Sequence, residues 1–313
     1  MRPRPACPVK AQKPRKLRKL QPATKAAQPV IPYNRYMEFI AENPSEQSGA
    51  GKLIRALKNK AKEAAMRFNI AVMSASYLRR LNQRAEAADD LELLRAFPGR
   101  NTSLLLSTLS HSKSQLRQDL FVLAELDFKR GGFFVEFGAT NGVDMSNTYL
   151  LEKDFAWKGI LAEPARRWHN DLRNNRTCDI ETNCVWRESN SLLAFNEVEV
   201  GEFSTITSFN ASDGHRKARR NGRVYEVTTI SLEDLLVKHN APRVIDYLSI
   251  DTEGSEYEIL SHFDFEKYHF RIITCEHNCT PTREKIFSLL TKNGYLRKLE
   301  NLSGFDDWYV RAS

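Results

Sequence analysis

The feature that most constrains the fold is an alternation, from residue 131 onward, of short apolar β-prone segments with amphipathic helical ones. The apolar segments predict strands at 133–137, 159–163, 183–186, 244–250, 271–275, 295–299 and 308–311. Apolar residues at three- and four-residue spacing predict helices between them, at 147–154, 165–174, 231–238, 255–262 and 282–293. Strands that alternate with helices form a mainly parallel sheet covered by helices on both faces. The predicted class is α/β, with the polar stretch 192–229 as an insertion that forms a hairpin and a mobile loop.

The chain before residue 111 differs from the rest in composition. Residues 1–45 are basic and rich in proline, and they contain too little apolar surface to form a core, so we predict a disordered basic tail. Residues 46–110 are predicted to form a helical N-terminal region, and residues 111–313 the main α/β domain. Residues 1–100 carry 21 Lys and Arg against 8 Asp and Glu, a net charge of +13, whereas the remaining 213 residues have a net charge of −5. An interaction with nucleic acid or an anionic membrane surface is therefore expected only through the basic tail.

Targeting signals are sparse. No run approaches the roughly 18 uninterrupted apolar residues of a membrane helix. The first 37 residues lack the apolar core of a signal peptide, and five cysteines do not make a disulfide framework. We therefore expect the protein in the reducing cytoplasm.

The first predicted strand runs into a glycine-containing turn, FFVEFGATNG (Phe133–Gly142). Gly138 and Gly142 permit a tight turn and a close approach of the backbone to a ligand. The turn is not a dinucleotide fingerprint of the form G-x-G-x-x-G, because Thr140 stands where the second glycine is needed. Glu136 lies two residues before Gly138, near the end of the strand.

Glu163 ends the second predicted strand, 21 residues after Gly142. A carboxylate at this place can accept hydrogen bonds from both ribose hydroxyls of a bound nucleoside. Since no glycine triplet for a pyrophosphate precedes it, the better ligand is a nucleoside without phosphates, such as S-adenosylmethionine.

Polar side chains also follow the fourth and fifth predicted strands. Asp251 ends the fourth strand within SIDTEGSEYEIL (Ser249–Leu260), and Glu276, His277 and Asn278 end the fifth within TCEHN. These residues meet at one edge of the sheet if the two strands are neighbours, because the carboxyl ends of parallel strands share an edge. Carboxylate and amide oxygens suit Mg²⁺, which predicts a metal site of Asp251, Glu276 and Asn278. The alternative is metal-free chemistry with Asp251 or His277 as the base.

With these residues in hand, the sequence resembles the FkbM family of class I S-adenosylmethionine-dependent methyltransferases over about residues 112–313. The resemblance rests on SQLRQDLFVL (Ser114–Leu123), VEFGATNG (Val135–Gly142), ILAEP (Ile160–Pro164), IDTEGSEYEIL and DDWYV (Asp306–Val310). It implies a Rossmann-like, mostly parallel sheet of seven strands with the last strand antiparallel, preceded here by a helical N-terminal extension. It also implies that the loop of Glu136, Gly138, Ala139, Asn141 and Gly142 binds the methionine end of S-adenosylmethionine, and that Glu163 binds the ribose.

The function that these expectations favour is O-methylation of a hydroxyl on a sugar, a glycan or another small natural product. Asp251, Glu276 and His277 are the candidate catalytic residues, because a hydroxyl is a poor nucleophile until a base or a cation draws off its proton. Two alternatives stay open. The chain could methylate nucleic acid that the basic N-terminal region delivers, or it could be a non-catalytic scaffold that keeps the fold.

Overall fold

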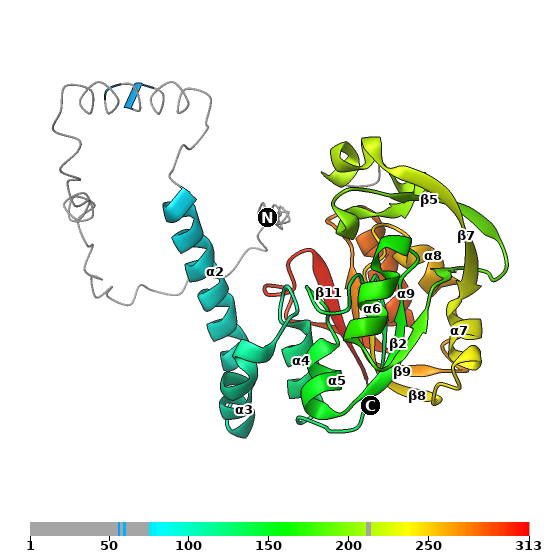
Figure 1. Ribbon diagram of the computed structural model, residues 1–313. Helices are drawn as coiled ribbons and strands as arrows, with labels where there is room; N and C mark the ends of the chain where they lie inside the picture. The colour runs from blue at the N-terminus through cyan, green and yellow to red at the C-terminus, as the bar shows by residue number, and fades with distance from the viewer. Residues whose placement is uncertain (1–55, 57–58, 61–74, 211–213, 313) are drawn as a thin grey trace, which may run out of the picture. The chain divides into compact units, whose positions relative to one another are not determined.

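The computed structural model describes residues 56, 59–60, 75–210 and 214–312 (Figure 1). The predicted basic tail and most of the predicted helical region before residue 75 lie outside the described residues. Helix α2 spans Ala75–Ala96 and α3 spans Arg100–Thr108. The break between them falls at Gly99, whose φ of 79° is one that glycine adopts readily. The described part of this region therefore contains two helices, and the predicted domain organisation stays a prediction.

The compact unit from residue 87 onward is built on a seven-stranded sheet in the order β10-β11-β9-β8-β1-β2-β3. The strands are β1 (Phe133–Phe137), β2 (Lys158–Ala162), β3 (Asp179–Glu181), β8 (Val244–Ile250), β9 (His269–Glu276), β10 (Tyr295–Lys298) and β11 (Asp306–Arg311). Strands β3, β2, β1, β8 and β9 pair in parallel, and β11 is antiparallel to both of its neighbours. The sheet is therefore mixed and mostly parallel, with the last strand of the chain reversed.

Helices cover both faces of this sheet (Figure 1). Phe134, Leu161 and Tyr247 point to one face, where they pack with α4 (Gln118–Glu125), α5 (Tyr149–Phe155) and α6 (His169–Asn175). Their chain neighbours Val135, Ile160 and Leu248 point to the other face, toward α7 (Leu232–Lys238), α8 (Glu256–Ser261) and α9 (Thr282–Lys292). Successive side chains of a strand point to opposite faces, so strands apolar at every position fit a sheet that is buried on both.

The register of the parallel strands aligns their carboxyl ends. Phe137 pairs with Ala162 on one side and with Ile250 on the other, and Ile250 pairs with Cys275. The residues that follow these positions are Gly138, Glu163, Asp251 and Glu276. They consequently stand at one level along one edge of the sheet.

A second sheet of four strands, in the order β4-β7-β5-β6, stands beside this edge. It comprises β4 (Cys184–Trp186), β5 (Leu192–Glu197), β6 (Thr205–Ile206) and β7 (Arg223–Ser231), with the short 3-10 turns η5 (Gly201–Phe203), η6 (Thr207–Phe209) and η7 (Gly214–Asn221). Its own small core contains Trp186, Phe195, Ile206 and Val227.

The second sheet corrects one expectation and extends another. The segment 183–186 was predicted as the third strand of the main sheet, but β3 at Asp179–Glu181 takes that place, and Cys184–Trp186 pairs with β7. All three residues of β4 are buried, so their apolar pattern predicts a strand without indicating its sheet. In the insertion, the expected hairpin is present as the antiparallel β5–β6 pair, and β7 pairs with the other side of β5 to form a larger sheet. No helix within the described ranges is long and apolar enough to cross a membrane.

Candidate active site

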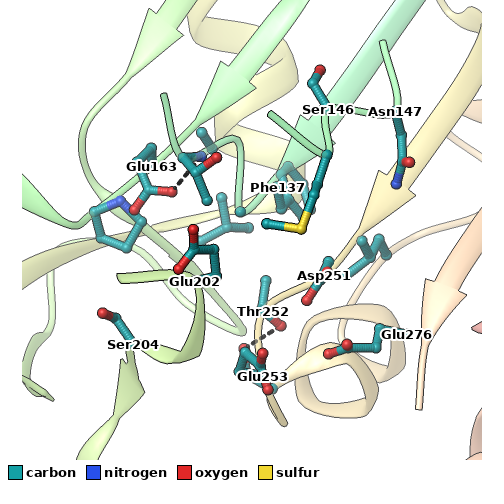
Figure 2. Close-up of a pocket in the computed structure, with 18 of the residues that line it drawn as sticks. Phe137, Ser146, Asn147, Glu163, Glu202, Ser204, Asp251, Thr252, Glu253 and Glu276 are labelled. Carbon is teal, nitrogen blue, oxygen red and sulfur yellow. Dashed lines mark hydrogen bonds between the residues drawn. The ribbon is translucent and has the colours of Figure 1, made fainter. Parts of the chain in front are cut away.

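A cleft opens between the carboxyl edge of the main sheet and the four-stranded sheet, with an empty volume of about 1040 Å³ that includes its open mouth. The predicted residues Glu163, Asp251 and Glu276 line it from the sheet edge (Figure 2), and so does Gly138. Phe195, Gly201, Glu202, Ser204 and Ile206 line it from the insertion.

Gly138 makes the turn from β1 into the cleft. It has a φ of 74°, and a Cβ atom built on it would lie 2.0 Å from the backbone oxygen of Asp251. The ends of β1 and β8 therefore approach so closely that only glycine fits between them. Thr140, the residue in the expected glycine position, also has a positive φ of 47°. The loop thus keeps a left-handed turn there without a glycine.

Glu136 serves to fasten this loop and does not line the cleft. Its carboxylate accepts hydrogen bonds from the backbone N–H of Asn147 at 2.7 Å and from the Ser146 hydroxyl at 3.0 Å, and also from the Thr148 hydroxyl. Arg176 lies 3.9 Å away and is buried. Burial raises the pKa of Glu136 although Arg176 and these hydrogen bonds oppose the rise. The predicted direct role at the methionine end becomes a supporting role.

Three other loop residues behave in the same way. Ala139 is buried, and neither it nor Asn141 lines the cleft. The Asn141 side-chain oxygen accepts from the backbone N–H groups of Val143 and Asp144, both at 2.9 Å. Gly142 has a φ of 79°, and its carbonyl accepts from Arg176 at 3.0 Å. These three residues shape the loop, and of the predicted cofactor residues only Gly138 and Glu163 face the cleft.

Glu163 follows β2 and is held rigidly at the cleft wall. One carboxylate oxygen accepts from the N–H of Thr140 at 2.8 Å, and the other from the N–H of Ala165 at 2.8 Å. Burial raises the pKa of Glu163 to about 7, although the two backbone hydrogen bonds oppose this rise. Each oxygen can accept a second hydrogen bond, because a carboxylate has about four acceptor positions.

Asp251 and Glu276 come together as predicted, and Glu253 joins them. One carboxylate oxygen from each of the three lies within 4.8 Å of the others. Asn278 lies beside this group, and its Nδ2 donates to Glu253 at 3.1 Å. The acidic residues that could hold a metal ion here are Asp251, Glu253 and Glu276, and a ligand role for the Asn278 carbonyl oxygen stays a prediction.

His277 is brought to the same strand end but does not line the cleft. Its side chain is buried, its Nδ1 accepts from the N–H of Cys279 at 3.0 Å, and its Nε2 lies 3.7 Å from Asp307. The side chain follows Glu276 in the chain and points to the other side of the strand. His277 therefore belongs to the buried structure behind the cleft and is not positioned to act as a base in it.

Three functional candidates were not predicted from the sequence. Arg219 of η7 has a fully buried side chain that donates to Glu253 at 2.8 Å and to the Phe203 carbonyl at 2.8 Å. Asp306 lines the cleft and accepts from Gln118 at 2.9 Å, and burial raises its pKa well above the usual range. Glu202 lines the cleft from η5. Of these three residues, Asp306 is the one that strand register would have indicated, because β11 pairs it with Glu276.

The strand order, the reversed last strand, the glycine turn after β1 and the carboxylate after β2 together define a Rossmann-like α/β fold with a polar cleft at the carboxyl edge of its strands. Comparison with protein families agrees with this class. Residues 136–300, more than half of the chain, match the model of the methyltransferase FkbM domain. The chain belongs to the FkbM methyltransferase family.

Solved structures with a similar arrangement include other methyltransferases. The FkbM methyltransferase of Methylobacillus flagellatus KT is 11% identical, with a TM-score of 0.41 over 85% of this chain and 72% of that one. The precorrin-6y C5,15-methyltransferase of Geobacter metallireducens GS-15 is 13% identical, with a TM-score of 0.32 over 61% and 84%. A TehB-like methyltransferase of Corynebacterium glutamicum is 6% identical, with a TM-score of 0.34 over 68% and 97%. No curated protein matches the sequence. The assignment rests on the family match.

Proposed function

We propose that the protein transfers a methyl group from S-adenosylmethionine to a hydroxyl oxygen of a sugar, a glycan or another small natural product. The observation that carries the cofactor assignment is Glu163, whose carboxylate is fixed in the cleft with acceptor positions to spare. Family membership supports methyl transfer. The acceptor class follows from the resemblance of the sequence motifs.

The cleft residues fit the proposed cofactor. Glu163 would accept the two ribose hydroxyls, and Gly138 lines the part of the cleft proposed for the methionine part. Cys184 and Val185 of β4 line the cleft and offer an apolar surface for the purine. S-adenosylmethionine, when bound, supplies a methyl group attached to a sulfonium sulfur. After the transfer, the rest of the cofactor is a neutral thioether.

Asp251 is the proposed base. It stands at the end of β8 and lines the cleft. Within the described ranges its carboxylate makes no hydrogen bond or ion pair, so it is available to accept the proton of an acceptor hydroxyl as the oxygen–carbon bond forms. Glu276 lies beside it and would orient the acceptor. His277 is less suited than Asp251, because it does not line the cleft.

Chelation separates this proposal from metal-assisted chemistry. We expect the protein to keep its activity after exhaustive EDTA treatment, because Arg219 already supplies a positive charge to Glu253 within the carboxylate group. Activity is measured as transfer of labelled methyl into acceptor, before and after Mg²⁺ is restored. Loss with EDTA and recovery with Mg²⁺ would instead assign a metal to Asp251, Glu253 and Glu276.

The pH dependence of cofactor binding tests the role of Glu163. The pKa of about 7 in the folded protein lies above the ordinary value of 4.5, so the free cleft binds a proton there at pH 6 and loses it by pH 8. The ionised carboxylate can accept hydrogen bonds from both ribose hydroxyls, whereas the protonated form must first lose its proton. Binding of S-adenosylmethionine, measured by calorimetry, is expected to be about tenfold weaker at pH 6 than at pH 8.

Glu163→Gln completes this test. The variant should bind about tenfold or more weakly at pH 8, since hydrogen bonds to a charged acceptor are lost, and it should have lost the pH dependence between 6 and 8. The exposed Glu199→Gln is the matched control and should behave as the unmodified protein does. Unchanged affinity and an unchanged pH profile in Glu163→Gln would remove the ribose assignment.

The raised pKa of Glu163 also affects stability. It makes the free energy of unfolding decrease as the pH rises from 4.5 through 7, because the folded state holds the proton to a higher pH than the unfolded state does.

A further inference from the structure

The cleft has an unusual balance of charge. Seven carboxylates line it, and among its described lining residues there is no Lys, Arg or His. The acidic residues are Asp144, Glu163, Glu202, Asp251, Glu253, Glu276 and Asp306. Figure 2 shows five of them, Glu163, Glu202, Asp251, Glu253 and Glu276, arranged around one open space. Such a lining repels anions and favours a ligand that brings positive charge.

The protein compensates only part of this charge itself. Glu253 is paired with the buried Arg219, and burial raises the pKa of Asp306 so that its carboxyl group favours the neutral form. Asp251 and Glu202 make no hydrogen bond or ion pair with any described residue. The proposed cofactor brings one net positive charge, from a sulfonium and an ammonium against one carboxylate. Uncompensated negative charge therefore remains in the cleft, and a positively charged acceptor would balance it.

The hydrogen-bonding groups of the cleft also favour a ligand that carries hydrogen-bond donors. Asn147 lines the cleft and is 9% exposed, and its Oδ1 has no donor. Its Nδ2 is already used, because it donates to the Ser249 hydroxyl at 2.9 Å. An orphaned buried acceptor is costly until a donor reaches it. The unsatisfied groups of the cleft are acceptors, so a complementary ligand is rich in N–H or O–H donors.

We infer that the methyl acceptor carries a protonated amine besides its reactive hydroxyl, as an amino sugar or an aminocyclitol does. This inference rests on the proposed function. The ammonium has no lone pair, so it serves for recognition, while the hydroxyl oxygen receives the methyl group and its proton passes to Asp251. Glu202 is the residue assigned to the ammonium, because it is the one cleft carboxylate on the insertion and no described residue neutralises it. A phosphate-bearing acceptor such as nucleic acid is disfavoured by the same charges.

The charge of the labelled product tests the inference even while the acceptor itself is unidentified. The full-length protein is incubated with S-adenosylmethionine labelled in the methyl group and an extract of its source cells, with a reaction lacking the protein as blank. Charcoal then removes the adenosyl compounds, and the labelled product is passed over cation and anion exchangers at pH 7. Retention on the cation exchanger is expected. A labelled product that is neutral or anionic overturns the inference and leaves the proposed function standing, whereas no label above the blank overturns both.

Glu202→Gln locates the recognition. With the labelled acceptor fraction as substrate, this variant should raise KM about tenfold or more, since a charge-assisted hydrogen bond is lost. Its kcat and its affinity for S-adenosylmethionine should remain within about twofold. Glu199→Gln removes the same charge from an exposed site outside the cleft and should change neither constant. An unchanged KM in Glu202→Gln, or weakened cofactor binding in place of a raised KM, overturns the assignment of Glu202.

Discussion

Gly138→Ala is expected to abolish detectable binding of S-adenosylmethionine and to lower the free energy of unfolding by about 3 kcal/mol or more. The added Cβ would stand 2.0 Å from the backbone oxygen of Asp251, and neither backbone can withdraw without breaking the pairing of β1 with β8. The alanine would also have to keep a φ of 74°, which costs about 1–2 kcal/mol in itself. Denaturant unfolding and calorimetry measure the two effects.

Gly294→Ala separates the two causes. Gly294 has a φ of 82°, close to that of Gly138, but a Cβ there meets nothing within 4 Å. This variant should lose only the conformational part, about 1–2 kcal/mol, and keep its affinity for S-adenosylmethionine. If Gly138→Ala is no less stable than Gly294→Ala and binds the cofactor normally, the close approach of β1 and β8 does not control the cleft.

Asp251→Asn is expected to reduce kcat by about 10²–10⁴-fold, the range in which general bases contribute. The substitution preserves the shape of the side chain and removes its ability to take a proton. Affinity for S-adenosylmethionine should stay within about twofold, because Asp251 is assigned to the acceptor hydroxyl. Transfer of labelled methyl into the cell extract measures the first quantity, and calorimetry the second.

Asp179→Asn is the matched control for that variant. Asp179 is exposed at the start of β3, outside the cleft, and should tolerate the same substitution with full activity. Normal turnover by Asp251→Asn would contradict its assignment as the base and would leave Glu276 as the carboxylate to examine. A joint loss of turnover and cofactor affinity would place Asp251 at the methionine end instead.

The positions of Glu163 and Asp251 could be predicted because strand ends are a local property of the sequence. An apolar run such as VIDYLSI stops at the residue where the polar edge begins, and parallel pairing brings all such ends to one edge. The same reasoning failed for Glu136, since a residue one position inside a strand end points into the packed face. There it meets Arg176, which lies 40 residues later in the chain.

Long-range pairing accounts for what the sequence did not show. Arg219 reaches Glu253 from a polar stretch, HRKARRNGRV, whose charges look alike before folding buries one of them. The destination of Cys184–Trp186 was likewise invisible, because an apolar strand of three residues fits either sheet equally well. In both cases the decisive partner lies on another element, and neither spacing nor composition identifies it.

The way in which the four-stranded sheet is attached has a consequence for how such a protein can diversify. Trp186, where the chain departs into this sheet, is paired with Ser231, where the chain returns. A segment whose two ends are neighbours can be lengthened, shortened or exchanged with little effect on the frame that holds it, since loop-closure entropy changes slowly with length. Replacement of the segment between Trp186 and Ser231 could therefore change the acceptor preference, while the main sheet with its proposed cofactor residues stays unchanged. A replacement would have to restore contacts such as the Arg219–Glu253 salt bridge and the hydrogen bond from the Thr205 hydroxyl to the Glu253 carbonyl at 3.1 Å.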